Sequence, residues 1–173
     1  LHPLKRAMSR LSSHSRYRPG DCIRHPMSVF MLWLWLLNDH VFKDLWGNAL
    51  TGKLSDISGL VVFPLMLVAT YELICAYRQR VATHLHLVLW LSLGISAMII
   101  ILINMSDWGA DFCRISLGLL QWPFRCLWSL SIVPIHIVHL TMDPTDLWTL
   151  GALFIPYTIV SSRLKRDIEQ VEK

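Results

Sequence analysis

Charged residues are scarce in this chain of 173 residues. Asp, Glu, Lys and Arg fill 16% of the positions, against about 25% in an ordinary soluble domain. Hydrophobic residues fill 54%, and the mean hydropathy is +0.46. This composition excludes an ordinary soluble domain and indicates a small multi-pass membrane protein.

Several common sequence signatures are missing. The four cysteines form no CxxC pair and have no zinc-site spacing. Gly52-Lys53 lacks the remaining residues of a phosphate-binding loop. There is no internal repeat and no low-complexity tract. Cys113 and Cys126 fall in the same predicted outer loop, where an oxidising compartment would favour a disulfide between them.

Acidic residues are absent from the first twenty positions. The whole chain has a net charge of +4 and a pI of about 9.0. The basic residues form blocks beside apolar segments, which favours a role in membrane orientation and argues against a nucleic-acid partner. Mitochondrial transit peptides and cytoplasmic tails of bacterial membrane proteins share this N-terminal composition. We favour the cytoplasmic tail.

Long apolar segments predict an all-α membrane protein with four transmembrane helices, each needing about 20 residues. The apolar run 26–37 is too short alone, so the first span must include its neighbours. The expected spans are 23–41, 56–77, 84–104 and 144–162, with a basic tail at 1–22, an outer loop at 105–143 and a charged tail at 163–173.

The basic residues predict the orientation of these spans. Of the 16 Lys and Arg residues, most fall on the side of the two termini, which is therefore predicted to be cytoplasmic, or the matrix side in a mitochondrion. The exceptions are Lys43, Lys53, Arg114 and Arg125.

The outer loop contains an apolar stretch that is interrupted by Pro123 and Pro134. A fifth span there would also send the basic C-terminal tail outward. We therefore expect residues 112–130 to form an amphipathic interfacial segment and residues 131–141 to be extended. Trp108, Trp122 and Trp128 would anchor the segment at the interface.

Three short polar segments fall at the outer ends of the predicted spans, at 38–40, 53–56 and 143–146. Ionisable groups at membrane depth cost about 2.5–3.5 kcal/mol each, so they persist where they pair, bind or gate. The candidate catalytic residues are Asp39, His40, Lys53, Asp56 and Asp146. The candidate ligands of a divalent metal, the one cofactor considered for this site, are Asp39, His40, Asp56, Asp143 and Asp146.

Each polar segment also has a structural interpretation. Asp143-Pro144 is typical of a helix start. The alternative is that Asp146 turns toward the bundle and binds a cation or Lys53. Ser55 or Asp56 would cap the second span. Asn38 would either cap the first span or belong to a site in which Asp39 orients His40 as a base or metal ligand.

The remaining ionisable residues give weaker indications. Glu72, inside the second span, is expected to pair with Arg78, Arg80 or His84. His136 and His139 would bind a metal only if their segment were helical, and we favour an extended segment. A bis-histidine haem is a further alternative that would use His25 with His84 or His86.

Three strings resemble a family of small uncharacterised bacterial integral membrane proteins. They are 37–43 (LNDHVFK), 50–60 (LTGKLSDISGL) followed by Pro64-Leu65, and 143–147 (DPTDL). The resemblance covers residues 26–160. It implies a bacterial inner membrane in preference to the mitochondrial inner membrane, and it implies no particular activity.

The function expected from the sequence is that of an accessory or scaffold subunit of a bacterial envelope membrane complex. The alternatives are an outer-face enzyme that uses a divalent metal or acts on a lipid head group, and an oligomeric channel or carrier for cations or protons. The expected partners are the lipid bilayer and either other proteins or further copies of the chain. Gly94, Ser96 and Ala97 offer a helix contact face.

Overall fold

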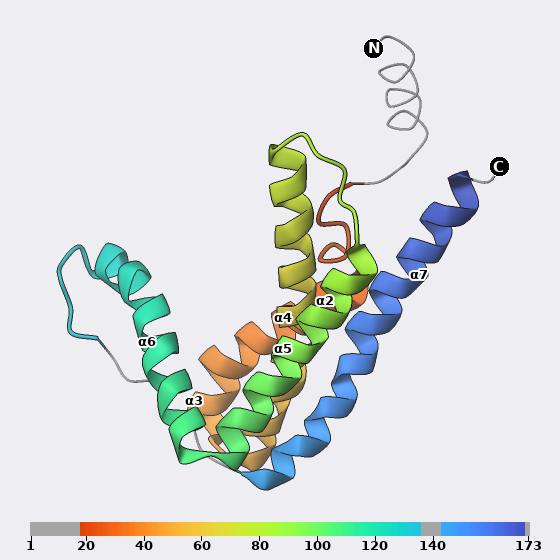
Figure 1. Cartoon of the computed structure of the whole chain (residues 1–173). Coiled ribbons are helices and arrows are strands. Elements are labelled where there is room, and N and C mark those ends of the chain that lie inside the picture. Colours follow the sequence, from red (N-terminus) through yellow and green to blue (C-terminus); the bar gives the residue numbers. More distant parts are fainter. Residues whose placement is uncertain (1–17, 136–142, 172–173) are drawn as a thin grey trace.

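The computed structural model describes residues 18–135 and 143–171, and every regular element within them is a helix (Figure 1). The all-α prediction is therefore confirmed. The elements are α2 (Pro26–Leu37), the π-helix η1 (Asn38–Phe42), α3 (Lys43–Trp46), α4 (Ala49–Tyr77), α5 (Leu85–Met105), α6 (Asp107–Ser129), the 3-10 helix η2 (Pro144–Leu153) and α7 (Phe154–Val171).

Helix α4 is the centre of the bundle, because α2, α5, η2 and α7 all pack against it. The loop between α4 and α5 lies at the same end as the two described chain ends (Figure 1). The buried core joins these elements through aliphatic side chains, which include Met31, Val61, Leu65, Val68, Leu89, Leu93 and Val160.

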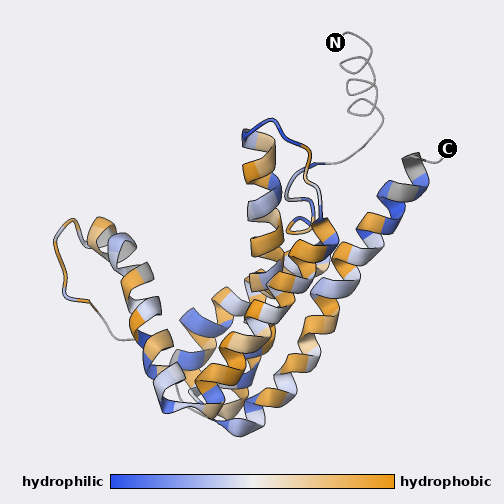
Figure 2. Ribbon diagram, in the orientation of Figure 1, coloured by the Kyte–Doolittle hydropathy of each residue, from blue (hydrophilic) through white to orange (hydrophobic). Residues whose placement is uncertain are grey.

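Two helices, α4 and α5, are long and apolar enough to cross a membrane. Apolar residues cover much of both, while hydrophilic residues gather in the loop between them and at the opposite end of the bundle (Figure 2). The limits of α5 agree with the predicted span 84–104 to within one residue.

The first two helices differ from their predicted limits. The helix that begins at Pro26 continues through η1 and α3 to Trp46, so Asn38 keeps helical backbone angles and does not end it. Helix α4 begins at Ala49, where Asn48 and Thr51 form a capping box. The predicted cap at Ser55 or Asp56 is therefore wrong, and both residues lie inside the helix.

The predicted helix start at Asp143-Pro144 is confirmed. The Asp143 side chain accepts a hydrogen bond from the Thr145 amide at 2.9 Å, and Pro144 occupies the first helical position. The chain forms a 3-10 helix here before α7, which continues to Val171 and so passes the predicted limit at 162.

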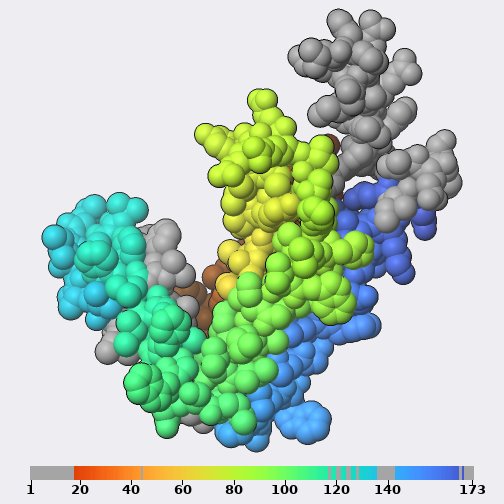
Figure 3. All heavy atoms as spheres, viewed as in Figure 1, coloured from red at the N-terminus to blue at the C-terminus, as the bar shows by residue number. Residues whose placement is uncertain are grey.

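The predicted outer loop contains helix α6, with Pro123 in its interior. Among the described elements α6 packs only against α5, and its C-terminal part stands away from the bundle (Figure 3). The predicted amphipathic character is confirmed, since Trp108, Phe112, Ile115 and Leu119 form an exposed apolar stripe. The side chain of Trp128 lies outside the described residues.

Helix α6 also corrects the disulfide expectation. Cys113 and Cys126 are both free and lie on this one helix. At 1.5 Å per residue they are about 20 Å apart along its axis, whereas a disulfide needs Cα atoms within about 7 Å. Residues 131–135 have no regular structure, and His136 and His139 lie outside the described residues.

Candidate functional site at the end opposite the termini

The three polar segments meet at the end of the bundle opposite the described termini, where Lys53 joins two elements. Its ammonium group lies 2.5 Å from Asp146 Oδ1, 2.6 Å from Thr145 Oγ1 and 3.5 Å from Asp143 Oδ2. Lys53 belongs to the first turns of α4 and its three partners belong to the start of η2. The predicted pairing of Asp146 with Lys53 is confirmed.

Asp143 is held from two further directions. Its amide donates to Asn104 Oδ1 at 3.0 Å, which ties the start of η2 to the end of α5. Hydrogen bonds from Thr145, together with the nearby Lys53 charge, lower the pKa of the Asp143 carboxyl below its ordinary value. Asp143 is therefore a carboxylate at neutral pH.

Asp56 lies one turn of α4 beyond Lys53 and is half-buried. Its carboxyl group interacts with that of Asp146 and, through charge, with Lys43 and Lys53. The carboxyl groups of Asp56 and Asp146 therefore share the positive charge of the neighbouring lysines. The Lys53 ammonium thus occupies the position that a bound cation would take among these carboxylates.

Asp39 belongs to a second group of contacts beside the first. Its carboxylate lies 2.6 Å from Lys43 Nζ and accepts a hydrogen bond from Ser55 Oγ at 2.9 Å. Lys43 also donates to Ser55 at 3.3 Å. His40 is exposed and forms no hydrogen bond or ion pair within the described residues. Asp39 therefore orients Lys43 and Ser55 in the structure, and not His40.

Asn38 is fully buried beneath these groups. Its Nδ2 donates to the Thr51 carbonyl at 2.8 Å, whereas its Oδ1 has no partner within the described residues. A π-helix begins at this residue, and π-helical turns inside α-helices occur frequently at functional sites. Asn38 thus joins η1 to the first turn of α4 from inside the protein.

In the described part of the chain, no three His, Cys, Asp or Glu side chains are grouped so that they could hold a metal ion. The carboxylates proposed as metal ligands fall into two groups. Asp39 contacts Lys43 and Ser55, whereas Asp56, Asp143 and Asp146 lie around Lys53. The divalent-metal hypothesis stays a prediction.

A second polar cluster, at the end of the termini, was not anticipated from the sequence. Glu72 is buried and pairs with Arg163 of α7 at 3.1 Å, and it accepts a hydrogen bond from the Gly20 amide at 2.7 Å. Arg163 also donates to the Arg18 carbonyl at 3.4 Å. The predicted pairing of Glu72 with Arg78, Arg80 or His84 is therefore wrong.

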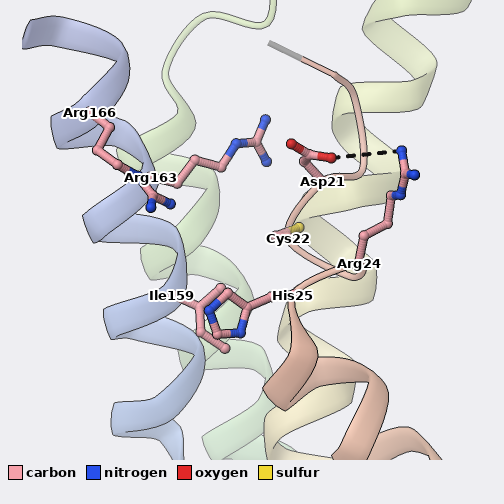
Figure 4. Close-up of a pocket in the computed structure, with 7 residues that line it drawn as sticks. All are labelled: Asp21, Cys22, Arg24, His25, Ile159, Arg163 and Arg166. Atoms are coloured by element: carbon pink, nitrogen blue, oxygen red, sulfur yellow. Dashed lines mark ion pairs between the residues drawn. The ribbon is translucent and has the colours of Figure 1, made fainter. Parts of the chain in front are cut away.

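A cavity of about 240 Å³ lies beside this cluster (Figure 4). It lies between α7 and the chain segment that precedes α2. Of the three histidines considered for a haem, only His25 lines it. The lining residues are Asp21, Cys22, Arg24, His25, Ile159, Arg163 and Arg166.

No protein-family model, characterised protein or solved structure matches this chain significantly. The resemblance of its three strings to small bacterial membrane proteins therefore stays a prediction.

Proposed function

We propose that this chain is a four-span protein of the bacterial inner membrane that serves as an accessory or scaffold subunit of an envelope complex. The observation that carries the proposal is the mutual pairing of the polar groups opposite the termini. Lys53, Asp143 and Asp146 satisfy one another across α4 and η2, as do Asp39, Lys43 and Ser55 across α3 and α4. Such pairs hold helices together.

The distribution of apolar surface supports a membrane location. The most apolar stretch of α5 is only 22% buried inside the protein, whereas the core helix of a soluble protein would be mostly buried. Its exposed side chains are large, and in water they would form an extended apolar patch. They include Leu87, Trp90, Leu91, Ile95 and Met98.

The order of the helices supports four crossings with both termini on the cytoplasmic side. The helical run from Pro26 to Trp46 and the run from Pro144 to Val171 are each about 20 residues or longer, the length that a crossing needs. These two runs and α4 and α5 alternate in direction (Figure 1). The basic residues at the end of the described termini then face the cytoplasm. They are Arg18, Arg24, Arg78, Arg80, Arg163, Lys165 and Arg166.

A partner helix would bind most closely at Gly94 of α5. Gly94 is exposed, and a Cβ atom added there would meet nothing within 4 Å. Small residues let transmembrane helices approach closely, because packing and not the hydrophobic effect joins helices in lipid. Ser96 is buried inside the protein and so is not part of this outward face.

The test is purification of the tagged chain in a gentle detergent, followed by mass spectrometry of copurifying proteins and by elemental analysis. We expect stoichiometric partners for the wild type and for Gly151→Leu, and their loss for Gly94→Leu. Gly151 is the matched control, since it is also exposed with open space around its Cβ position. A chain that purifies alone with a stoichiometric divalent metal would contradict the proposal.

The second candidate is an outer-face enzyme or a cation carrier that uses the same carboxylates. The observation in its favour is the contact between Asp56 and Asp146 beside the Lys53 ammonium. Asp56→Asn distinguishes the two functions. A scaffold would lose little assembly, whereas an enzyme or carrier would lose its activity while still inserting in the membrane.

A further inference from the structure

The cavity at the end of the termini has the chemistry of an anion site. Three guanidinium groups line it, from Arg24, Arg163 and Arg166, against the single carboxylate of Asp21. Arginine is the side chain best suited to bind phosphate, because its planar fork donates two parallel hydrogen bonds. The lining therefore favours a phosphate group over a neutral ligand.

Arg163 forms the fixed wall of the cavity. Its guanidinium is mostly buried and is held by the Glu72 carboxylate and the Arg18 carbonyl. Glu72 therefore neutralises most of this charge. A bound anion would depend mainly on Arg24 and Arg166.

Arg24 and Arg166 are both exposed; Arg24 lies on the segment before α2, where it pairs with Asp21, and Arg166 lies on α7 (Figure 4). Arg24 has a weak competitor, since its ion pair with Asp21 is exposed and measures 3.9 Å. Arg166 has no hydrogen bond or ion pair to any described residue. Both side chains are thus available to a phosphate group.

His25 adds a donor and a helix start to the same cavity. Its Nδ1 accepts a hydrogen bond from the Met27 amide at 3.3 Å, so in the neutral ring the proton is on Nε2. Helix α2 begins at the next residue. The positive end of its dipole favours an anion at this position.

The surroundings of the cavity favour a lipid over a free phosphate compound. Its volume of about 240 Å³ has room for a phosphate group, so the acyl chains of a lipid would lie outside it. Ile159 gives it an apolar side, and Met27 and Phe30 are exposed on the adjoining turns of α2.

We propose that this cavity binds the phosphate group of an anionic phospholipid in the leaflet that faces the two termini. Basic pockets between transmembrane helices on the cytoplasmic side are suited to such head groups. The proposal rests on the membrane location given under the proposed function. The phosphate would draw on arginines from both walls of the cavity, and so join the segment before α2 to α7.

The experiment uses the full chain purified in a neutral detergent. Binding of short-chain phosphatidylglycerol, phosphatidylcholine and glycerol 3-phosphate is measured by native mass spectrometry for the wild type, for Arg24→Gln/Arg166→Gln and for Arg80→Gln. Arg80 is the matched control, since it is an exposed arginine at the same end of the bundle that does not line the cavity.

We expect the wild type and Arg80→Gln to prefer phosphatidylglycerol to phosphatidylcholine, and the double variant to bind it about tenfold more weakly. Equal binding by wild type and double variant, or an equal loss in Arg80→Gln, would overturn the site. Glycerol 3-phosphate bound as tightly as the lipid would overturn the lipid assignment. Membrane fractionation of the same variants tests the membrane location separately, so the two proposals fail in distinguishable ways.

Discussion

Glu72 of α4 and Arg163 of α7 form a buried ion pair at 3.1 Å, although 91 positions separate them in the sequence. The same carboxylate accepts a hydrogen bond from the Gly20 amide. One acidic residue thus holds together the segment before α2, the central helix and the last helix. The whole end of the bundle near the termini depends on this carboxylate.

Replacement of Arg163 by Met should lower the free energy of unfolding by about 3–5 kcal/mol, because it leaves the buried Glu72 carboxylate without its cation. Thermal unfolding of the purified chain in detergent would measure this. The double variant Glu72→Leu/Arg163→Met should recover much of the loss, since it removes both buried charges. A double variant as unstable as the single one would show that Arg163 acts through packing alone.

Asp146→Asn should cost about 1.5–3 kcal/mol, because it removes the charge of a mostly buried carboxylate that pairs with Lys53 between α4 and η2. Lys53→Met removes the partner of this carboxylate and should also destabilise the protein. The double variant should cost less than the sum of the two, with a coupling of about 0.5–3 kcal/mol. The control is Asp39→Asn, whose ion pair with Lys43 is more exposed and should contribute less than about 1 kcal/mol. Additive losses would contradict the direct pairing.

The thiol of Cys22 should resist a maleimide at pH 7.5 in the folded protein. Cys22 is 1% exposed, and burial, with a further contribution from the Glu72 charge, raises the pKa of its thiol from 9.0 to about 11. The reactive thiolate is therefore scarce. Cys126, which is half-buried near the end of α6, should label faster, and all four cysteines should label after denaturation. Rapid labelling of Cys22 in the folded protein would show that the segment before α2 opens readily.

The same pKa shift predicts a loss of stability in alkaline solution. The pKa of the Cys22 thiol is higher in the folded than in the unfolded protein, so its contribution to stability is fully present below pH 9. This contribution should fall as the pH rises from 9 towards 11. Thermal unfolding of the wild type and of Cys22→Ala over this range would measure it, and the variant should show a smaller loss. Parallel curves would contradict the assignment to Cys22.

Gly109→Ala should destabilise the protein by about 1–3 kcal/mol, because its Cβ atom would clash with the Leu102 carbonyl oxygen and force α6 away from α5. Gly59→Ala is the control. Gly59 lies inside α4 with open space at its Cβ position, so alanine there should stabilise by about 0.5–1 kcal/mol. If both variants were stabilised, the loss of backbone entropy in the unfolded chain, and not the contact with Leu102, would determine the effect at Gly109.

Local signals predicted part of this structure correctly. The limits of α5 follow from a long apolar run between polar neighbours, and the helix start at Asp143-Pro144 follows from capping chemistry. The earlier start of α4 at Ala49 was missed, although Asn48 and Thr51 are themselves capping residues. The polar residues 53–56 suggested a helix start, whereas in the structure they lie inside α4, where Lys53 and Ser55 bind side chains of other elements.

Contacts between distant residues could not be predicted in the same way. Nothing in the sequence near Glu72 indicates a partner in α7. Arg78, Arg80 and His84 lie closer to it in the sequence, so a local ion pair was predicted. Likewise, Pro123 suggested an interruption, but it lies inside α6. The pairing of Lys53 with Asp146 was one of two alternatives, and packing of η2 on α4 decided between them.

Helix α4 contributes one residue to each of two ion pairs, Lys53 to the pair with Asp146 and Glu72 to the pair with Arg163. The distance between them along the helix can be compared with the thickness of a membrane. At 1.5 Å per residue, α4 rises about 28 Å between Lys53 and Glu72, close to the roughly 30 Å of a bilayer's hydrocarbon core. In a thicker bilayer one of the pairs would be drawn into hydrocarbon, and in a much thinner one apolar turns would be wetted. In the proposed crossing, the two ion pairs would thus lie at the two edges of the hydrocarbon core, where their charges stay within reach of water.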